Sequence, residues 1–336
     1  MKIYIFLINK SSIGGIEKVA NNLSIILSEY SDSVDVEVID IADLKVLYGD
    51  HSEFLLCVKF IKDIVESDLI LSLYDRLSIQ LSFAKIYLKT NIKLVACQHA
   101  DFYANRIHTR ILRRIFYCAT NQIVALTSAD YDLYVKSRFK NVAIIPNPIS
   151  FYPKTIPLFS SRANSVVAAG RLSKVKAFNN VINLAVIMSD IESVGFSIYG
   201  DGEEREALSL YANSMGVCDN ILRGSTSKLD DIFLVSKFLV VTSLRESFSM
   251  VILEAMAAGC IPISFDCPTG PREIIDDGVN GFLVPMGDIF KIKNTVEMLM
   301  NNPVLAEEIS FNARLKASLY TKDNILSMWR RIIDEL

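Results

Sequence analysis

The sequence lacks several patterns that would indicate a particular chemistry. Its six cysteines form no C-x-x-C pair and have no histidine-rich neighbourhood, which argues against a zinc site or a disulfide framework. No G-x-G-x-x-G fingerprint follows the first predicted strand, which argues against a nicotinamide dehydrogenase. Internal repeats and low-complexity segments are also missing. We expect the cysteines to be small buried hydrophobic residues in a reducing compartment.

Long uncharged hydrophobic runs are missing as well. The best candidate, residues 248–265, contains Glu254, Gly259 and Pro262, so a buried helix followed by a strand fits better than a membrane span. The first nine residues are too short for a signal peptide and have the composition of a buried strand. A net charge of −3 gives no support for nucleic-acid binding. These features predict a cytoplasmic protein.

Positive charge is concentrated in one segment. Residues 81–140 contain ten Lys or Arg and three Asp or Glu. Within this segment, residues 106–116 have the pattern of a basic amphipathic helix, which is a type that can lie on an anionic membrane surface. The alternative is a solvated helix face on a globular domain. Peripheral contact with the inner membrane through region 81–140 is therefore one of two open interpretations.

Short apolar runs alternate with helical patterns along the whole chain, which predicts parallel sheets covered by helices on both faces. Prolines crowd into residues 145–157 and indicate a linker. We therefore expect two doubly wound α/β domains, residues 1–150 and 151–321, with a ligand site in the cleft between them. A last helix over residues 322–336 could pack back on either domain. The predicted strands span residues 2–8, 34–39, 68–73, 92–97, 122–126, 142–145, 165–169, 194–199, 219–222, 238–242, 261–265 and 282–284.

Two glutamates in the second half are the most informative residues. Glu254 is the only charge between Phe248 and Phe265, and a lone buried carboxylate is costly unless it is hydrogen-bonded. If a helix begins near Ser249 or Met250, its free N–H groups form an anion site between Glu246 and Glu254. That arrangement suits a nucleotide sugar, which has hydroxyls at both ends and a diphosphate between. Alternatively, Glu246 caps a helix and Glu254 pairs with a buried cation.

Two further segments suit the same ligand. Arg171 and Lys176 follow a predicted strand, where two cations can offset the charge of a diphosphate leaving group. Gly14 and Gly15 follow the first strand, where the backbone can approach a phosphate or a sugar. Each segment taken singly is also compatible with an ordinary solvated loop.

Taken together, these motifs resemble those of the family 4 retaining glycosyltransferases of the GT-B fold. The resemblance covers nearly the whole chain and extends to members that build bacterial surface polysaccharides. It implies an α/β protein with two Rossmann-like domains facing each other across a cleft, an acceptor-side domain first and a donor-binding domain second. The motifs are residues 14–17, 144–148, 170–176, 199–202, 246–259 and 266–275.

The resemblance also implies roles for individual residues. Arg171 and Lys176 would hold the donor diphosphate, Glu246 the hydroxyls of the transferred sugar, and Glu254 the ribose. His99 would lie near the reacting carbon. The implied catalytic residues are His99, Arg171, Lys176 and Glu246. The implied donor-binding residues are Gly14, Gly15, Arg171, Lys176, Arg223, Gly224, Glu246, Ser247, Phe248, Ser249, Met250, Val251 and Glu254.

The chain departs from the family pattern at three positions. Ala177 stands where the family often has glycine after the lysine, and Ser247 and Ser249 stand where it has glycines around the phenylalanine. Backbone N–H donors survive these changes, because every residue except proline supplies one. The serine hydroxyls would lie near the sugar, so the donor preference could differ from that of the glycine-bearing members.

The predicted function is retaining transfer of a hexose or an N-acetylhexosamine from a nucleotide sugar, with a UDP-sugar as the expected donor. The acceptor would be a growing glycan or a lipid-linked oligosaccharide of a capsule, O-antigen or exopolysaccharide. No metal and no cofactor are expected. The Asp-x-Asp pair Asp130 and Asp132 has the spacing of a metal site, but we interpret it as the capped start of a helix. A sugar-nucleotide epimerase and a non-catalytic partner subunit remain alternatives.

Overall fold

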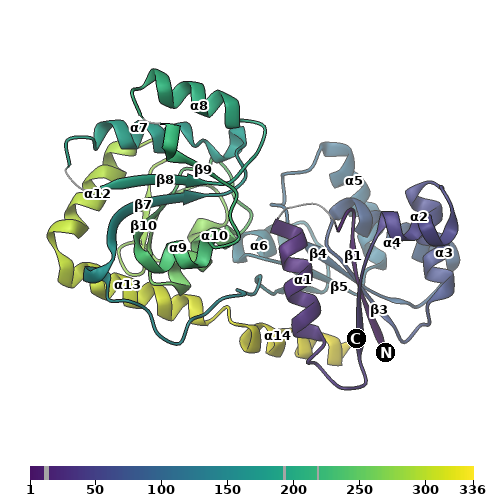
Figure 1. The fold of residues 1–336 in the computed structure, drawn as a ribbon. Coiled ribbons are helices and arrows are strands. Elements are labelled where there is room, and N and C mark those ends of the chain that lie inside the picture. The colour runs from purple at the N-terminus through teal and green to yellow at the C-terminus, as the bar shows by residue number, and fades with distance from the viewer. Residues whose placement is uncertain (11–14, 192–193, 218) are drawn as a thin grey trace. The chain divides into compact units, whose positions relative to one another are not determined.

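The structure is a computed structural model that describes residues 1–10, 15–191, 194–217 and 219–336. The chain forms two compact units, which Figure 1 shows as two separate sheets with their helices. Unit 1 consists of Met1–Pro148 together with Lys322–Leu336, and unit 2 consists of Ile149–Thr321. Each unit is an α/β layer structure with its own hydrophobic core.

Unit 1 is built on a six-stranded parallel sheet with the strand order β2-β1-β3-β4-β5-β6. Its strands are β1 (Lys2–Leu7), β2 (Asp35–Asp40), β3 (Leu69–Ser72), β4 (Lys93–Gln98), β5 (Gln122–Ala125) and β6 (Val142–Ile144). Its helices are α1 (Gly15–Leu27), α2 (Ile41–Tyr48), α3 (Glu53–Asp63), α4 (Asp75–Leu88), α5 (Ile107–Phe116), α6 (Ser128–Lys136) and α14 (Lys322–Glu335).

Both faces of this sheet are buried, because successive residues of a strand point to opposite sides. Ile5 and Leu7 of β1 pack with α1 and α14, whereas Phe6 packs with α2, α3 and α4. The only tryptophan, Trp329, anchors α14 in the first of these cores, and Figure 1 shows α14 beside α1. The C-terminal helix thus belongs to unit 1, although the whole of unit 2, Ile149–Thr321, separates it in sequence from the rest of unit 1.

Unit 2 contains the second six-stranded parallel sheet, with the strand order β12-β11-β10-β7-β8-β9. Its strands are β7 (Ala163–Ala169), β8 (Gly195–Tyr199), β9 (Leu222–Gly224), β10 (Ser236–Val241), β11 (Ile261–Phe265) and β12 (Phe282–Val284). Its helices are α7 (Asn179–Ile187), α8 (Arg205–Ser214), α9 (Leu229–Val235), α10 (Met250–Ala257), α11 (Pro271–Ile274), α12 (Ile289–Asn301) and α13 (Pro303–Ser318).

The two doubly wound parallel sheets predicted from the sequence are confirmed, and each of the twelve predicted strands is present. The boundaries differ by one or two residues at several strands, and the largest error is at residues 219–222, where the strand begins only at Leu222. Asp219–Ile221 form a 3₁₀ turn instead. Leu222 is the first residue that pairs with β8, and the preceding Asp219 and Asn220 are of types that favour turns.

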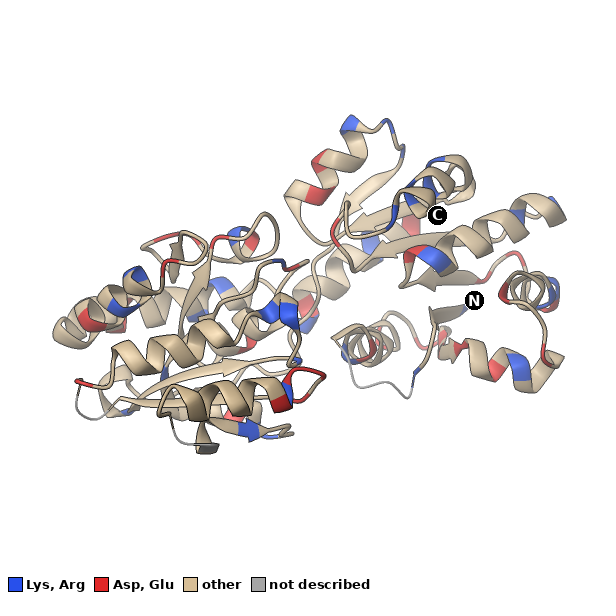
Figure 2. Cartoon of the chain, turned by 90° about the horizontal axis from the view of Figure 1, so that it is seen from above, with Lys and Arg blue, Asp and Glu red and all other residues tan. Residues whose placement is uncertain are grey.

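The expectation for the cysteines holds with one correction. Cys57, Cys97, Cys260 and Cys267 are buried, and burial raises the pKa of the Cys57 and Cys260 thiols to about 12. Cys118 is exposed, because the turn after α5 carries it to the surface. Cys218 lies outside the described residues. Within the described ranges, no helix combines the length and apolar composition that crossing a bilayer requires. Figure 2 shows residues of both charge signs distributed over each unit.

Candidate functional site

The strand order of unit 2 marks one position where a ligand can bind. β7 lies at the centre of the sheet, with β8 on one side and β10 on the other. The chain therefore turns in opposite directions after β7 and β10, and in open α/β sheets ligands bind at the carboxyl ends of such diverging strands. Residues 170–178 follow β7 and residues 242–249 follow β10. These two loops contain six of the thirteen predicted donor-binding residues, and Met250 and Val251 follow the second loop directly.

The two loops are joined by hydrogen bonds. The backbone N–H of Leu244 donates to the carbonyl oxygen of Val175 at 2.8 Å. The Thr242 hydroxyl donates to the carbonyl oxygens of Lys176, at 3.1 Å, and Ala177, at 3.0 Å. The two loops therefore form one rigid platform at the carboxyl edge of the sheet.

A buried glutamate and a half-buried lysine meet on this platform. The Lys176 Nζ lies 2.5 Å from Oε1 of Glu246, and the Ser243 hydroxyl donates to the same oxygen at 2.7 Å. The Glu246 side chain is 8% exposed and the Lys176 side chain 22%. An ion pair with this little exposure is screened less by water than a surface pair. The structure thus brings together two predicted catalytic residues that lie 70 positions apart in the sequence.

The backbone of Glu246 is held from a third loop, at the end of β11. The Thr269 hydroxyl donates to the carbonyl oxygen of Glu246. Gly270 has a φ of 81°, and a Cβ at this position would lie 2.8 Å from the Cβ of Glu246. Ser243, Thr269 and Gly270 were missed as site residues. A usable signal was present, because each lies just after a predicted strand, where the loops of a parallel sheet converge.

Glycines fix the position of the basic loop. The N–H of Gly170 donates to the carbonyl of Tyr199, and the N–H of Gly200 donates to the carbonyl of Gly224, both at 2.9 Å. These bonds continue the ladder between β7, β8 and β9 beyond the ends of the strands. A Cβ at Gly200 would lie 1.9 Å from the carbonyl oxygen of Gly170, so only glycine allows this close approach.

The remaining cations of the predicted site differ in their surroundings. Arg171 is exposed and makes no hydrogen bond or ion pair with the part of the chain that the structure describes. Arg223 lies on the edge strand β9, where its Nε donates to the Ser197 hydroxyl at 3.4 Å. Because β7 and β8 lie between β9 and β10, Arg223 is not brought to Glu246. A ligand that reached both would have to extend across the edge of the sheet.

Helix α10 begins at Met250, as the sequence predicted. Its N-cap is Ser249 and not Glu246, so the alternative interpretation of Glu246 as a helix cap is wrong. The first N–H groups of the helix have no acceptor within the helix and can bind an anion. Glu254 is buried one turn further on and takes part in interactions within the chain. Ser247 is half-buried and Phe248 is buried, with its ring 5.8 Å from that of Tyr320.

Ser249 is strained at a position where the family pattern has glycine. Its φ is 63°, a left-handed conformation that costs a residue with a Cβ about 1–2 kcal/mol. Its hydroxyl oxygen is buried and has no hydrogen-bond partner among the described residues. Ala177, another of the three departures from the family pattern, also has a positive φ, of 47°. These two departures thus fall where the backbone itself favours glycine, whereas Ser247, the third, does not have a positive φ.

Ser249→Gly is expected to raise the free energy of unfolding of unit 2 by about 1–2 kcal/mol. The change relieves the left-handed strain and removes a buried hydroxyl without a partner, and these gains exceed the entropic cost of the added glycine. Urea unfolding measures the effect. Ser247→Gly is the matched control, because Ser247 has no positive φ and should gain nothing. An unchanged or lower stability of Ser249→Gly would contradict the assignment of strain.

Unit 1 contains the other predicted site residues. Gly14 lies outside the described residues, and Gly15 is the first residue of α1. His99 follows β4 directly, and its Nε2 is buried and has no hydrogen-bond partner within the described ranges. Burial lowers the pKa of His99 to about 4, so the imidazole is neutral near pH 7. A neutral imidazole donates a hydrogen bond from one ring nitrogen and accepts one at the other, without adding charge to the site.

The Asp-x-Asp pair forms the start of a helix, as expected, although the capping residue is Thr127. The Thr127 hydroxyl accepts the N–H of Asp130, while the carboxylate of Asp130 accepts the N–H of Phe102 at 2.9 Å. Asp130 is buried and Asp132 is exposed. Asp130 therefore fixes the loop that follows His99, and the two carboxylates do not converge on one point.

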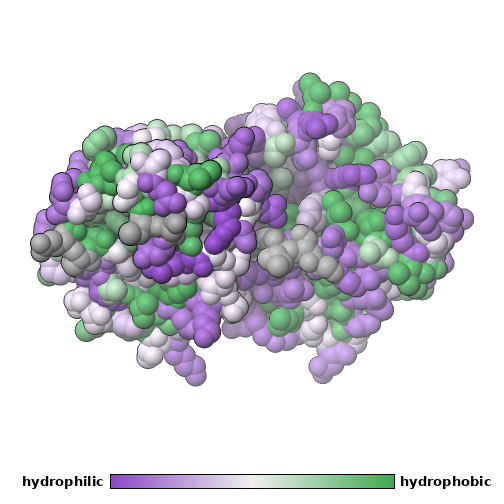
Figure 3. All heavy atoms as spheres, turned by 45° about the horizontal axis from the view of Figure 1, so that its top comes forward, coloured by the Kyte–Doolittle hydropathy of each residue, from purple (hydrophilic) through white to green (hydrophobic). Residues whose placement is uncertain are grey.

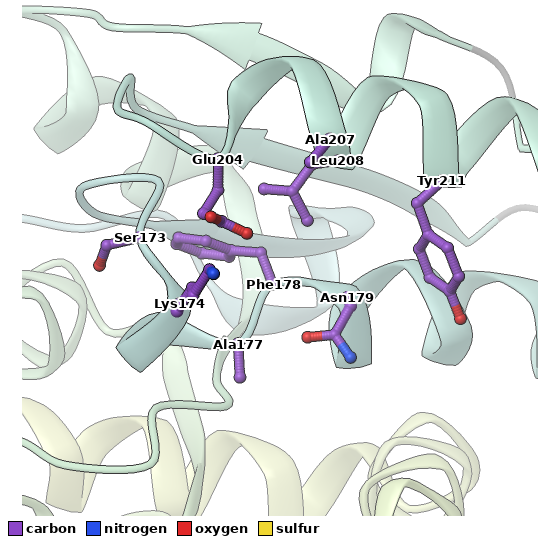
Figure 4. Close-up of a pocket in the computed structure, with 9 residues that line it drawn as sticks. All are labelled: Ser173, Lys174, Ala177, Phe178, Asn179, Glu204, Ala207, Leu208 and Tyr211. Atoms are coloured by element: carbon purple, nitrogen blue, oxygen red, sulfur yellow. The ribbon is translucent and has the colours of Figure 1, made fainter.

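A pocket of about 310 Å³ lies beside the basic loop of unit 2, between the N-terminal ends of α7 and α8. Figure 4 shows Lys174 and Glu204 close to the ring of Phe178, with Tyr211 at the opposite end. None of the predicted donor-binding residues lines this pocket, so the Lys176–Glu246 platform is the better candidate site. The lining residues are Ser173, Lys174, Ala177, Phe178, Asn179, Glu204, Ala207, Leu208 and Tyr211.

Comparison with known proteins agrees with this geometry. Residues 155–316, which lie within unit 2, match the family model of glycosyl transferases group 1. The amylovoran biosynthesis glycosyltransferase AmsD of Erwinia amylovora is 24% identical over 99% of each chain. A Campylobacter jejuni N-acetyl-D-galactosaminyltransferase, named for an undecaprenol-linked acceptor, is 28% identical over 81% of this chain and 76% of its own.

The fold also matches that of solved glycosyltransferase structures. The crystal structure of Anabaena HepE in complex with UDP-glucose aligns with a TM-score of 0.81 at 19% identity and covers 100% of both chains. The chain has the GT-B fold and is similar in sequence to bacterial glycosyltransferases. The GT-B fold expected from the sequence is thereby confirmed. The motif order had predicted a GT-B glycosyltransferase related to polysaccharide-building enzymes, and the similarity to glycosyl transferases group 1 and to AmsD agrees with that prediction. Membership of family 4 stays a prediction.

Proposed function

We propose that this protein is a metal-independent, retaining GT-B glycosyltransferase of family 4 that uses a nucleotide sugar, namely a UDP-sugar. It transfers a hexose or an N-acetylhexosamine to a growing glycan or a lipid-linked oligosaccharide of a bacterial surface polysaccharide, on the cytoplasmic side of the inner membrane. The observation that carries the proposal is the Lys176–Glu246 pair at the diverging strand ends of unit 2, directly before the N-terminus of α10. HepE binds UDP-glucose on the same fold, which supports the choice of donor.

The donor would lie along the platform with its groups in a fixed order. Lys176 and Arg171 neutralise the diphosphate, together with the N–H groups of Met250 and Val251. Glu246 accepts hydrogen bonds from hydroxyls of the transferred sugar, and Glu254 serves the ribose. Lys176 is paired with Glu246 in the structure, and donor binding would exchange this ion pair for one bond to phosphate and one to sugar.

Transfer then proceeds by attack on the face from which the diphosphate leaves. The bond between the anomeric carbon and the phosphate oxygen breaks, and the acceptor oxygen forms the new glycosidic bond on the same side. The proton of the acceptor hydroxyl moves to the departing phosphate oxygen, which gives a nucleoside diphosphate as the second product. The chain contributes electrostatic stabilisation of the leaving group and positioning of the sugar. His99, neutral near pH 7, would lie beside the reacting carbon.

A donor screen tests the proposal. A panel of nucleotide sugars is first ranked by thermal stabilisation of the purified chain, and the best donor is then incubated with polysaccharide fragments or lipid-linked oligosaccharides. We expect glycan product with retained configuration, and the same rate in excess EDTA as without it. Loss of turnover in EDTA would contradict the metal-independent assignment.

The alternatives give different outcomes in the same screen. An epimerase would convert the donor with no acceptor present. A non-catalytic partner subunit would bind the donor without turnover. Arg171→Ala, which removes an exposed cation and leaves the core intact, should abolish transfer in a folded chain. Full activity of this variant would refute the donor-site assignment.

A further inference from the structure

Helix α5 in unit 1 buries one of its arginines, Arg113, and exposes its three isoleucines. Arg113 is 1% exposed, and its guanidinium donates to the Asp75 carboxylate at 3.2 Å and to the Tyr134 hydroxyl at 2.9 Å. Ile111 and Ile115 lie two residues to either side of Arg113. At 100° per residue they point about 160° away from it. The buried arginine thus turns these isoleucines away from the core, and the sequence interpretation of Arg113 as part of a basic surface was wrong.

The isoleucines form one exposed stripe. Ile107 is 72% exposed, Ile111 55% and Ile115 54%, and their spacing of four places them on the same side of the helix. A surface helix normally buries its apolar face against the core. The only residue of α5 that is buried is Arg113. The stripe is therefore an apolar surface that is left uncovered, which is the usual mark of an interaction site.

The stripe continues onto α4 through aromatic contacts. Phe116 at the end of α5 packs on Phe83 of α4, with ring centroids 4.9 Å apart, and Phe83 stacks on Phe54 at 4.5 Å. Tyr87, one turn beyond Phe83, is exposed. We name the resulting surface the α4–α5 face. It comprises Phe83, Ile86, Tyr87, Ile107, Ile111 and Ile115.

The charge of this face has one sign. Helix α5 contains no acidic residue, and the single acid of α4, Asp75, is buried with Arg113. Arg110 and Arg114 flank the isoleucine stripe and, together with Ile107 and Ile111, line a hollow of about 200 Å³. Figure 3 shows hydrophobic and hydrophilic atoms side by side at the surface of this unit. The face thus combines apolar side chains with arginines and offers no exposed carboxylate within α4 and α5.

We propose that the α4–α5 face docks on the interface of a bilayer that contains anionic phospholipids. The isoleucines, Phe83 and Tyr87 would enter the boundary between headgroups and acyl chains, and Arg110 and Arg114 would bind lipid phosphates. Anionic lipid fits better than a protein partner for two reasons. The apolar stripe and the flanking arginines lie on the same convex helix. The two helices also expose no carboxylate that could pair with basic residues of another protein. The contact is interfacial, since no helix in the described part of the chain can span a bilayer.

Vesicle flotation with the full-length chain tests the inference. We expect the chain to float with vesicles of phosphatidylglycerol and phosphatidylcholine at physiological salt, and at least about tenfold less with phosphatidylcholine alone. Ile111→Ser/Ile115→Ser should lower flotation with the anionic vesicles at least roughly tenfold, because two inserted side chains lose their burial. Arg110→Gln/Arg114→Gln should lower it and weaken its salt dependence.

A matched control comes from unit 2. Leu210→Ser/Leu315→Ser removes from α8 and α13 two leucines that are at least as exposed as Ile111 and Ile115, and it should leave flotation unchanged. All variants change exposed residues, and thermal unfolding confirms that they are folded. Absence of flotation by the wild type, equal binding to neutral vesicles, or unchanged flotation of Ile111→Ser/Ile115→Ser would each overturn the proposal. A dimer in solution that dissociates in this double variant would show that a second copy covers the face. Because flotation measures binding to vesicles, the outcome of this test does not depend on the proposed transfer reaction.

Discussion

Glu246→Gln is expected to lower the rate of sugar transfer about 10²-fold or more, through loss of sugar positioning, while the affinity for the nucleoside diphosphate product does not fall. Two features of the structure produce this split. The Glu246 carboxylate is paired with Lys176, so the neutral amide frees the lysine for phosphate. The amide has only one acceptor oxygen, and without a charge it accepts weaker hydrogen bonds from sugar hydroxyls than the carboxylate does.

Steady-state transfer rates, together with calorimetric titration of the nucleoside diphosphate, measure the two effects separately. Lys176→Met is the complementary variant and should weaken both the affinity and the rate, because it removes a cation from the diphosphate. Glu308→Gln, an exposed glutamate on α13, is the matched control and should behave as the wild type. Transfer by Glu246→Gln within twofold of the wild-type rate would remove Glu246 from the site. A fall in diphosphate affinity as large as that of Lys176→Met would contradict the exchange of partners.

Gly200→Ala is expected to lower the free energy of unfolding of unit 2 by about 3 kcal/mol or more, from steric overlap and backbone strain together. The new Cβ would lie 1.9 Å from the carbonyl oxygen of Gly170, far inside contact distance. The φ of Gly200, 142°, is also unfavourable for a residue with a side chain. Relief requires the loops after β7 and β8 to separate, which would displace Arg171. Donor affinity should therefore fall together with stability.

Gly195→Ala at the other end of the same strand is the matched control. A Cβ at Gly195 meets nothing within 4 Å, and its φ is not positive. This substitution should leave stability unchanged or raise it by about 0.4–1 kcal/mol, since alanine restricts the unfolded chain. Urea unfolding of both variants, followed by circular dichroism, gives the comparison. Equal stabilities of the two variants would show that the Gly170–Gly200 contact can relax at little cost.

The architecture of this chain was readable from local patterns. Runs such as residues 2–8 and 261–265 are apolar on both alternating sets of positions, and that composition is typical of strands buried on both faces. The hypothesis of a helix beginning near Ser249 or Met250 agrees with the start of α10 at Met250. The resemblance in motif order then supplied roles for residues that no pattern could assign.

What the sequence by itself determined is therefore the order of strands and helices, the two parallel sheets and the set of polar residues at strand ends. The tertiary structure alone decided that Lys176 pairs with Glu246, that Thr269 and Gly270 hold the backbone of Glu246, and that Arg113 is buried. The physical reason is that periodicity and turn chemistry act over a few residues, whereas these contacts join segments from 23 to 70 residues apart. Such contacts depend on which strands become neighbours and on where each loop leaves the sheet.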